Sequence, residues 1–248
     1  MGGEAPSTPA RAVIRHGQAG FQRPPSRAGV FPFSEAGTGH AAFFDLDGTL
    51  TTHRSSWQFL HEHFGTWSEY GEQLQGRFFS GEITYAEWCR HDAKPWVGMT
   101  RGQLVEAGRG ISYADGARET VAELRANGVT VFLLSMGLNV VVERVAGELG
   151  IETWVANELC FNGERFTGEV RVHIGWGEKG RVAQRLMRER GLPPERAVAV
   201  GDSESDLSMF AIVGKSIAVN PRDERTVQAA DLVIHGSLAQ LLPLILGR

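Results

Sequence analysis

Cysteine, basic charge and long apolar runs are all scarce in this chain of 248 residues. Its two cysteines, Cys89 and Cys160, stand far apart and show no CxxC spacing, which argues against a disulfide framework and a zinc site. Basic residues number 25 and acidic residues 29, so the chain lacks the basic surface on which general nucleic-acid binding relies. No apolar stretch approaches the roughly 18 residues of a membrane span, and the N-terminus lacks the apolar core of a signal peptide. We therefore expect a cytoplasmic enzyme or binding protein without nucleic-acid or membrane partners.

Hydrophobic periodicity is also missing from residues 1–38, where Ala, Gly, Pro and Ser dominate. Prolines in this stretch break any helical or strand pattern. A segment of this composition cannot bury enough apolar surface to offset the entropy lost on folding. We expect a disordered N-terminal extension.

From residue 41 onward, short apolar runs alternate with stretches of helical periodicity. The runs predict buried strands at 41–46, 130–135, 197–202, 216–219 and 231–234. Apolar residues at helical spacing, usually closing on a glycine, predict helices at 116–128, 139–150, 179–191 and 204–214. This alternation predicts an α/β fold, with a doubly wound parallel sheet between layers of helices.

Two segments interrupt the alternation. The stretch "FNGERFTGEV" (161–170) predicts a hairpin, with Asn-Gly at its turn. The segment 65–111 has no strand pattern and is rich in Trp, Phe and Glu, which predicts a small helical insert. We expect the tryptophans in and beside this insert to form its own core: Trp57, Trp67, Trp88 and Trp96. The predicted division is a catalytic core at 39–64 and 112–248 with a helical cap at 65–111.

Polar side chains stand where the predicted strands end. They are Asp45 and Asp47 after the first strand, Ser135 at the second, Asp202 and Asp206 after a later one, and Lys179 on the preceding helix. Because ligands bind at the carboxyl ends of strands in such sheets, we expect these side chains at one rim. Three carboxylates can hold a hard cation such as Mg²⁺. Hydroxyl, ammonium and amide donors suit a phosphoryl group, which an aspartate could attack.

Four motifs in this order resemble those of the haloacid dehalogenase (HAD) superfamily. They are "DLDGTLT" (45–51), "LLSMG" (133–137), "GEKG" (177–180) and "GDSESD" (201–206). The resemblance covers residues 41 to about 240. The position of the insert and the stretch "NGERFTGEV" are similar to the phosphoserine phosphatase branch, which carries a helical cap after the first motif. The resemblance implies a HAD-like Rossmannoid core with a C1-type cap.

The resemblance also implies which residues do the chemistry. Asp45 would be the nucleophile that forms an aspartyl-phosphate. Asp47 would protonate the leaving oxygen and later activate the hydrolytic water. Magnesium would be held by Asp45, the backbone carbonyl of Asp47 and Asp202. The implied activity is magnesium-dependent hydrolysis of a small phosphorylated metabolite.

Other motif residues would bind the phosphoryl group or support those that do. By the same resemblance, Ser135, the backbone beside it at Met136, and Lys179 would bind the phosphoryl oxygens. Asp206 would orient the lysine and the metal ligands, and Thr49 would support the first motif.

Other readings stay open at this point. A phosphotransferase of the same family would pass the phosphoryl group to an alcohol. A receiver module of two-component signalling also gathers acids, a Ser or Thr and a Lys at the rim of a parallel sheet, but it is about half this length. A binding protein of the same fold without activity is a further alternative. The intact set of acids and lysine favours an enzyme.

The residues expected to face the substrate do not suit phosphoserine. In the phosphoserine phosphatases an acidic residue after the first motif holds the amino group, and a cap arginine holds the carboxylate. Counting from Asp45, the acidic position falls on Arg54, and the arginine position falls near Asp92, with Arg90 two residues away. Charges of the wrong sign would repel both ends of phosphoserine. Alternatively, Arg54 and Asp92 pair with each other, and in either case the pair of residues that binds serine is absent. We expect another small metabolite, such as a sugar or polyol phosphate.

Overall fold

The computed structural model describes residues 40–247, and the extension expected at 1–38 lies outside that range. A seven-stranded sheet runs through the described part in the order β4-β3-β2-β1-β5-β6-β7. Neighbouring strands are parallel except for β4, which runs antiparallel to β3. The strands are β1 (His40–Phe44), β2 (Val129–Leu138), β3 (Thr153–Asn162), β4 (Arg165–Arg171), β5 (Ala197–Gly201), β6 (Lys215–Val219) and β7 (Leu232–Ile234). The predicted α/β fold is confirmed.

The central strand β1 is buried on both faces because consecutive side chains of a strand point to opposite sides. Phe43 belongs to the apolar core on one face of the sheet, where it stacks on Phe132 with ring centroids 4.6 Å apart. Phe44 belongs to the larger core on the opposite face. A run that is apolar at every position therefore indicates a strand between two helical layers.

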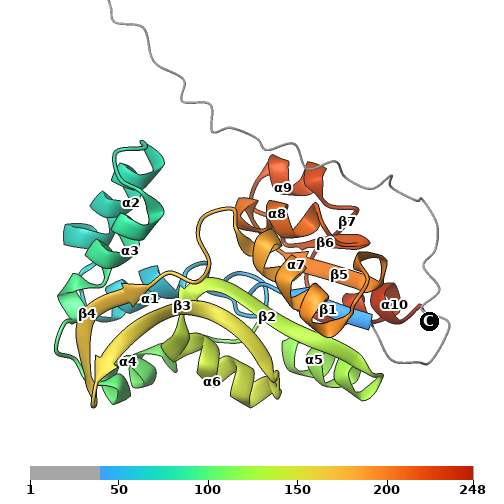
Figure 1. Ribbon diagram of the computed structural model, residues 1–248, viewed down its shortest axis with the longest axis horizontal. Helices are drawn as coiled ribbons and strands as arrows, with labels where there is room; N and C mark the ends of the chain where they lie inside the picture. Colours follow the sequence, from blue (N-terminus) through green and yellow to red (C-terminus); the bar gives the residue numbers. More distant parts are fainter. Residues whose placement is uncertain (1–39, 248) are drawn as a thin grey trace, which may run out of the picture.

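Helices cover both faces of this sheet, as Figure 1 shows. They are α1 (Ser56–His63), α2 (Glu72–Phe79), α3 (Tyr85–Asp92), α4 (Arg101–Gly108), α5 (Ala117–Ala126), α6 (Asn139–Leu149), α7 (Lys179–Arg190), α8 (Leu207–Phe210), α9 (Glu224–Ala229) and α10 (Leu241–Leu246). Capping boxes at Thr84 and Thr100 begin α3 and α4, since each hydroxyl accepts a backbone N–H and the third helical residue reaches back. Within 40–247, no helix has both the length and the apolar character to cross a membrane.

The inserted segment 65–111 contains α2, α3 and α4, a π-helical turn at Trp67–Gly71 and a 3-10 turn at Lys94–Trp96. In Figure 1, α2 and α3 project beyond the edge of the sheet, whereas α4 lies beside α6 in the helical layer. Trp96 is fully buried, and its ring lies 4.6 Å from that of His61. The aromatic core expected for the insert is therefore present around Trp96.

Two elements differ from the expectations. The hairpin at 161–170 is present, but its first strand begins at Thr153 and joins the sheet parallel to β2. Its sequence, "TWVANELCFN", mixes polar and apolar residues, so no continuous apolar run marks it. The helix expected at 204–214 is only a 3-10 turn at Glu204–Asp206 followed by the four residues of α8. Asp206 lies in that turn, where its carboxylate accepts the backbone N–H groups of Asp202 and Ser203 in the preceding loop.

Candidate active site

The polar residues expected at the strand ends meet at one rim of the sheet. Asp45 follows β1, and its backbone N–H donates to the Val200 carbonyl of β5. Asp202 follows β5, and Ser135 lies within β2, whose register shifts just beyond it. The three strands are neighbours in the sheet, so their carboxyl ends bring residues from distant parts of the chain together.

Lys179 joins two of these carboxylates. Its ammonium, on the first residue of α7, donates to Asp45 Oδ1 at 2.5 Å and to Asp206 Oδ1 at 2.7 Å. A third donation reaches the Ser205 hydroxyl at 3.3 Å. The Lys179 side chain is only 1% exposed, so these contacts replace the water that a lysine normally keeps.

The opposite charges keep this lysine protonated. Burial alone lowers the pKa of Lys179, but the carboxylates of Asp206 and Asp45 outweigh it and raise the pKa above the usual lysine value. The second oxygen of Asp206 accepts the backbone N–H groups of Asp202 and Ser203, at 3.0 and 3.2 Å. Asp206 therefore fixes both the lysine and the loop after β5.

Asp47 lies beside the first carboxylate but has other partners. The Ser56 hydroxyl donates to Asp47 Oδ2 at 2.9 Å, while Oδ1 is buried with no hydrogen-bond partner among the described residues. Burial raises the pKa of Asp47, and the hydrogen bonds from Ser56 oppose the shift. A side chain at Gly137 would collide with this group, since a Cβ there would lie 2.3 Å from Ser56 Oγ and 2.8 Å from Asp47 Oδ2. Glycine thus lets the backbone after Ser135 approach the carboxylate closely.

The acidic cluster fits a metal ion. Asp45, Asp202 and Asp206 each offer a carboxylate oxygen, and these oxygens lie within 4.8 Å of one another. Asp202 Oδ1 is buried without a hydrogen-bond partner in the described structure. Burial raises the pKa of Asp202 to about 6, against the effect of Arg222. A cation among these carboxylates would stabilise their ionised forms, and an all-oxygen set suits a hard divalent ion.

A guanidinium already contacts two groups of this site. Arg222 Nε donates to Asp202 Oδ2 at 2.5 Å, and Nη2 donates to the Asp47 carbonyl at 3.2 Å. These are two of the three groups expected to hold magnesium, so the structure accommodates positive charge where the metal was predicted. The sequence analysis missed Arg222 because it lies outside the four motifs.

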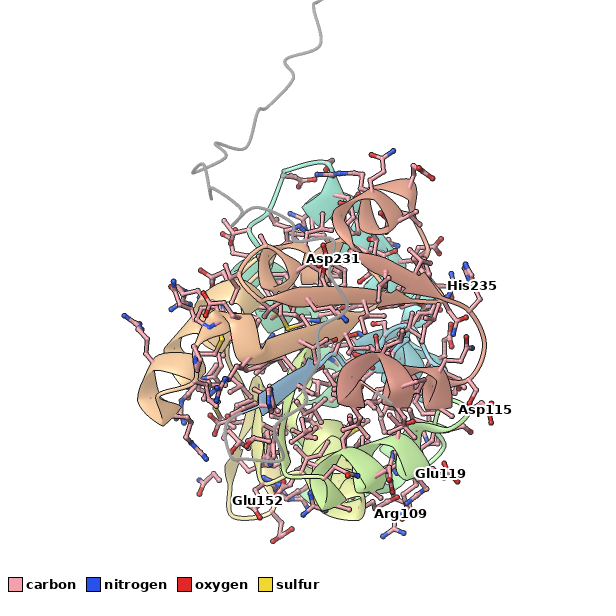
Figure 2. The ribbon with its side chains drawn as sticks, turned by 90° about the vertical axis from the view of Figure 1, so that its right-hand side faces the viewer. Arg109, Asp115, Glu119, Glu152, Asp231 and His235 are labelled. Carbon is pink, nitrogen blue, oxygen red and sulfur yellow. The ribbon has the colours of Figure 1, made fainter. Side chains whose placement is uncertain are left out.

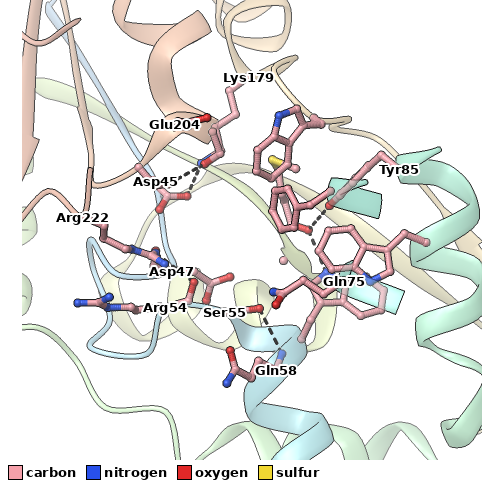
Figure 3. Close-up of a pocket in the computed structure, with 18 of the residues that line it drawn as sticks. Asp45, Asp47, Arg54, Ser55, Gln58, Gln75, Tyr85, Lys179, Glu204 and Arg222 are labelled. Carbon is pink, nitrogen blue, oxygen red and sulfur yellow. Dashed lines mark hydrogen bonds and ion pairs between the residues drawn. The ribbon is translucent and has the colours of Figure 1, made fainter. Parts of the chain in front are cut away.

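A cavity of about 590 Å³ opens over this cluster, between the inserted helices and the rim of the sheet. Asp45, Asp47 and Lys179 form part of its lining, and Figure 3 shows them at one end, with Arg222 and Arg54 nearby. Met136 and Gly137 also line it, whereas Ser135 and Asp202 lie behind the lining. Thr49 is buried, with its hydroxyl 3.4 Å from Asp45 Oδ2.

The cap residues expected at the substrate are placed differently. Arg54 lines the cavity, but Arg90 is exposed and Asp92 is buried, and neither is part of the lining. Asp92 Oδ1 lies 3.0 Å from His61 Nε2 of α1, away from the cavity lining. This corrects the expectation for Arg90 and Asp92, because α3 packs Asp92 against α1 and does not present it to the cavity. Of the tryptophans, Trp96 is buried in the aromatic core as expected, whereas Trp57 and Trp88 also line the cavity.

Asn157 is a further residue that the sequence analysis missed. Its amide nitrogen donates to the carbonyls of Met136 and Ile174 and lies 3.2 Å from the Tyr85 hydroxyl. Its amide oxygen accepts the N–H groups of His173 and Ile174. Asn157 therefore connects the end of β2, the helix α3 and the loop that leads to Lys179. The mixed sequence of β3 gave no signal for it, because Asn157 is one of several polar residues in that strand.

The comparison with protein families decides to which family this chain belongs. Residues 42–211 match the model of the haloacid dehalogenase-like hydrolase family. The chain belongs to this family. The match includes every motif residue that meets at the rim of the sheet, from Asp45 to Asp206.

Similar proteins narrow the branch of this HAD family. A phosphoserine phosphatase of Archaeoglobus fulgidus is 30% identical over 73% of the chain, and the alignment spans 52% of that protein. A phosphoserine phosphatase of Methanocaldococcus jannaschii is 26% identical over 71% of the chain and 82% of its own length. A solved structure described as a phospho-aspartyl intermediate analogue of phosphoserine phosphatase has a TM-score of 0.73 at 25% identity, covering 84% of this chain and 100% of that one. These similarities place the chain in the phosphoserine phosphatase-like branch and indicate a phosphatase, rather than a receiver module or an inactive binding protein.

Proposed function

We propose that this HAD phosphatase is magnesium-dependent and hydrolyses a small phosphorylated metabolite other than phosphoserine through an aspartyl-phosphate on Asp45. One observation carries the proposal: Lys179 links Asp45 to Asp206 at the end of the cavity where the acidic cluster lies. A buried carboxylate held beside a lysine and further carboxylates is positioned for a reaction with phosphorus. A cap at 65–111 over a core at 39–64 and 112–248 is part of the proposal.

The proposed metal ligands are Asp45, the Asp47 carbonyl and Asp202. The unpartnered oxygen of Asp202 and the contacts of Arg222 with Asp202 and the Asp47 carbonyl support this assignment. A bound magnesium ion would neutralise negative charge on the phosphoryl group. Near the proposed metal site, Lys179 stays protonated and adds a second positive charge on the same side of the cavity.

The first half-reaction belongs to the two aspartates. A carboxylate oxygen of Asp45 attacks phosphorus, and the bond from phosphorus to the substrate's ester oxygen breaks. Asp47 gives its proton to that leaving oxygen, so the product leaves as a neutral alcohol. The Ser56 hydroxyl holds one oxygen of Asp47, which leaves the unpartnered Oδ1 to carry the proton.

The second half-reaction restores both residues. Asp47, now a carboxylate, removes a proton from a water molecule, and the resulting oxygen attacks phosphorus of the aspartyl-phosphate. The bond between phosphorus and Asp45 breaks, and inorganic phosphate leaves. Throughout, Ser135, the backbone at Met136 and Lys179 hold the phosphoryl oxygens, while Thr49 and Asp206 hold Asp45 and Lys179.

Phosphoserine is the alternative that the names of the relatives raise. An amino acid needs a carboxylate for its ammonium and a cation for its own carboxylate. Among the described lining residues, those from α2 and α3 are uncharged: Gln75, Phe79, Tyr85 and Trp88. The uncharged lining from α2 and α3 therefore favours a substrate that lacks the ammonium and carboxylate groups of an amino acid.

The test follows phosphate release and the covalent intermediate together. Purified protein with magnesium should release phosphate steadily from phenyl phosphate. Brief reaction with a ³²P-labelled ester should leave label on the protein that hydroxylamine removes, as expected for an acyl phosphate. The Asp45→Asn variant should carry no label. Steady turnover without labelled protein, or label on Asp45→Asn, would contradict the proposed intermediate, and phosphoserine as the best substrate would contradict the proposed substrate.

A further inference from the structure

Two large aromatic side chains remain exposed inside the cavity. Phe79, the last residue of α2, is 61% exposed, and Trp176, in the loop between β4 and α7, is 41% exposed. Both line the cavity, and their rings meet edge to face with centroids 5.4 Å apart. Exposed apolar surface in a concave site commonly marks the place of a ligand.

The aromatic surface continues from this pair into the cavity. We call it the aromatic wall and define it by Trp57, Phe79, Tyr85, Trp88 and Trp176, all of which line the cavity. Behind it, Phe78 stacks on the Trp88 ring at 4.9 Å and lies 5.4 Å from that of Trp176. Figure 3 shows aromatic rings gathered around Tyr85, on the side of the cavity opposite Arg54 and Arg222.

The polar groups of two residues of the aromatic wall already have hydrogen-bond partners within the protein. Trp57 Nε1 and the Tyr85 hydroxyl both donate to the Met136 carbonyl, each at 3.2 Å. The Tyr85 hydroxyl also lies 3.2 Å from the amide nitrogen of Asn157. These contacts leave the carbon faces of the rings for a ligand. An apolar group gives up no hydrogen bonds with water when it packs on these faces, whereas each polyol hydroxyl that the rings cover would need a new partner.

The charged lining residues lie elsewhere, on the core side of the cavity. They are Asp45, Asp47, Arg54, Lys179, Glu204, Arg222 and Asp223. The cavity is therefore charged where the phosphoryl group is proposed to sit and apolar beyond it. A volume of about 590 Å³ leaves room for a group larger than the phosphate itself.

We propose that the substrate is a phosphate monoester of an apolar alcohol, whose alkyl or aryl group packs on the aromatic wall. This inference rests on the proposed phosphatase function and replaces the expected sugar or polyol. The phosphoryl group faces Asp45, and the apolar part extends toward Phe79 and Trp176 at the cap.

A homologous series of substrates tests the proposal. The values of kcat/KM are measured for ethyl, butyl, hexyl and phenyl phosphate, beside glycerol 1-phosphate, ribose 5-phosphate and phosphoserine. Burial of each methylene should raise kcat/KM about two- to fourfold, so hexyl phosphate should exceed ethyl phosphate by at least about tenfold. Equal rates along the alkyl series, or a sugar phosphate or phosphoserine as the best substrate, would overturn the inference.

Substitutions in the aromatic wall test which of its residues cause the dependence of kcat/KM on chain length. Trp176→Ala and Phe79→Ala should each lower the ratio of hexyl to ethyl turnover several-fold, and Trp176→Phe should retain most of it. Val233→Ala, an exposed apolar residue on β7, is the matched control and should keep the wild-type ratio. An unchanged ratio in both alanine variants would overturn the role of the wall.

Measuring the binding of ligands that cannot be hydrolysed tests the apolar substrate independently of the proposed phosphatase activity. Hexylphosphonate, which has no ester bond to hydrolyse, should bind at least about tenfold more tightly than ethylphosphonate by calorimetry, and Trp176→Ala should reduce the difference. Phosphate release from all esters without a chain-length trend would overturn only the apolar substrate. No release from any ester would overturn the phosphatase and the substrate class with it.

Discussion

The two ends of the cavity are built in opposite ways. At the end where the phosphoryl group is proposed to bind, which we call the phosphate end, Lys179, Asp45 and Asp206 are buried charges that satisfy one another at 2.5 and 2.7 Å. At the cap end, Phe79 and Trp176 are partly exposed rings that contact each other without any ion pair. The first end depends on exact electrostatic geometry, and the second depends on shape and apolar area.

This difference predicts that one end of the cavity governs catalysis and the other governs the choice of substrate. Buried charges tolerate little change, because removing one partner leaves another without compensation. An aromatic surface tolerates more, since its contribution scales with the area that a ligand covers. Substitutions at the phosphate end should therefore abolish turnover, and those at the cap end should change the choice of substrate.

The largest effect is expected from Asp45→Asn. The amide is nearly the same size, but it cannot attack phosphorus and binds a metal poorly, so kcat should fall at least about a thousandfold, or roughly 4 kcal/mol of barrier. Steady-state phosphate release measures the effect, with circular dichroism as the check on folding. Asp115→Asn, at the exposed residue labelled in Figure 2, is the matched control. Activity within tenfold of wild type in a folded preparation would remove Asp45 as the nucleophile.

The second effect concerns metal removal. Exhaustive chelation should abolish phosphate release, and magnesium should restore it better than zinc because the proposed ligands are all oxygens. Asp202→Ala should bind magnesium at least about tenfold more weakly by calorimetry, since the ion loses one carboxylate ligand. The exposed Glu119 provides the control as Glu119→Ala. A rate that survives chelation would show that the metal assignment is wrong.

A smaller effect is expected at Asn157, which links the two ends. In Asn157→Leu the N–H groups of His173 and Ile174 lose their acceptor, and the buried N–H of Ile174 then costs about 1–3 kcal/mol. The melting temperature should fall by several degrees, and kcat/KM about tenfold, because Met136 and Tyr85 lose a common partner. Asn157→Asp keeps the acceptor but places a carboxylate oxygen against the Met136 and Ile174 carbonyls, so it should also lower the melting temperature. Equal melting temperatures for all three proteins would contradict this role.

The smallest effect concerns Arg222, whose guanidinium contacts two of the proposed metal ligands. Arg222→Gln removes this competing charge, so magnesium should bind a few-fold more tightly by calorimetry. Without metal, the variant should melt at a lower temperature, because Asp202 loses its ionic partner. Arg225→Gln is a matched control, since Arg225 pairs with Glu204 at the surface. Weaker magnesium binding in Arg222→Gln would show that the arginine supports the metal instead.

The phosphate end could be predicted from the sequence because its residues are tied to strand ends. A run such as "AAFFDL" must be a strand buried on both faces, and parallel neighbours must end at the same rim. The structure accordingly brings Asp45, Asp202 and Asp206 together at this rim, with Lys179 between two of them. The family match confirms the resemblance on which their proposed roles depend.

Only the tertiary structure decided which side chains line the cavity. The direction of α3 buries Asp92 against His61 and turns Tyr85 and Trp88 into the cavity, and no local pattern distinguishes these faces. Trp176 joins Phe79 through the packing of a loop on an inserted helix, and Arg222 reaches Asp202 across 20 residues of chain. Hydrophobic periodicity predicts which face of a helix packs against the core. It does not predict which residues its other faces contact, because that depends on the packing of segments far apart in sequence.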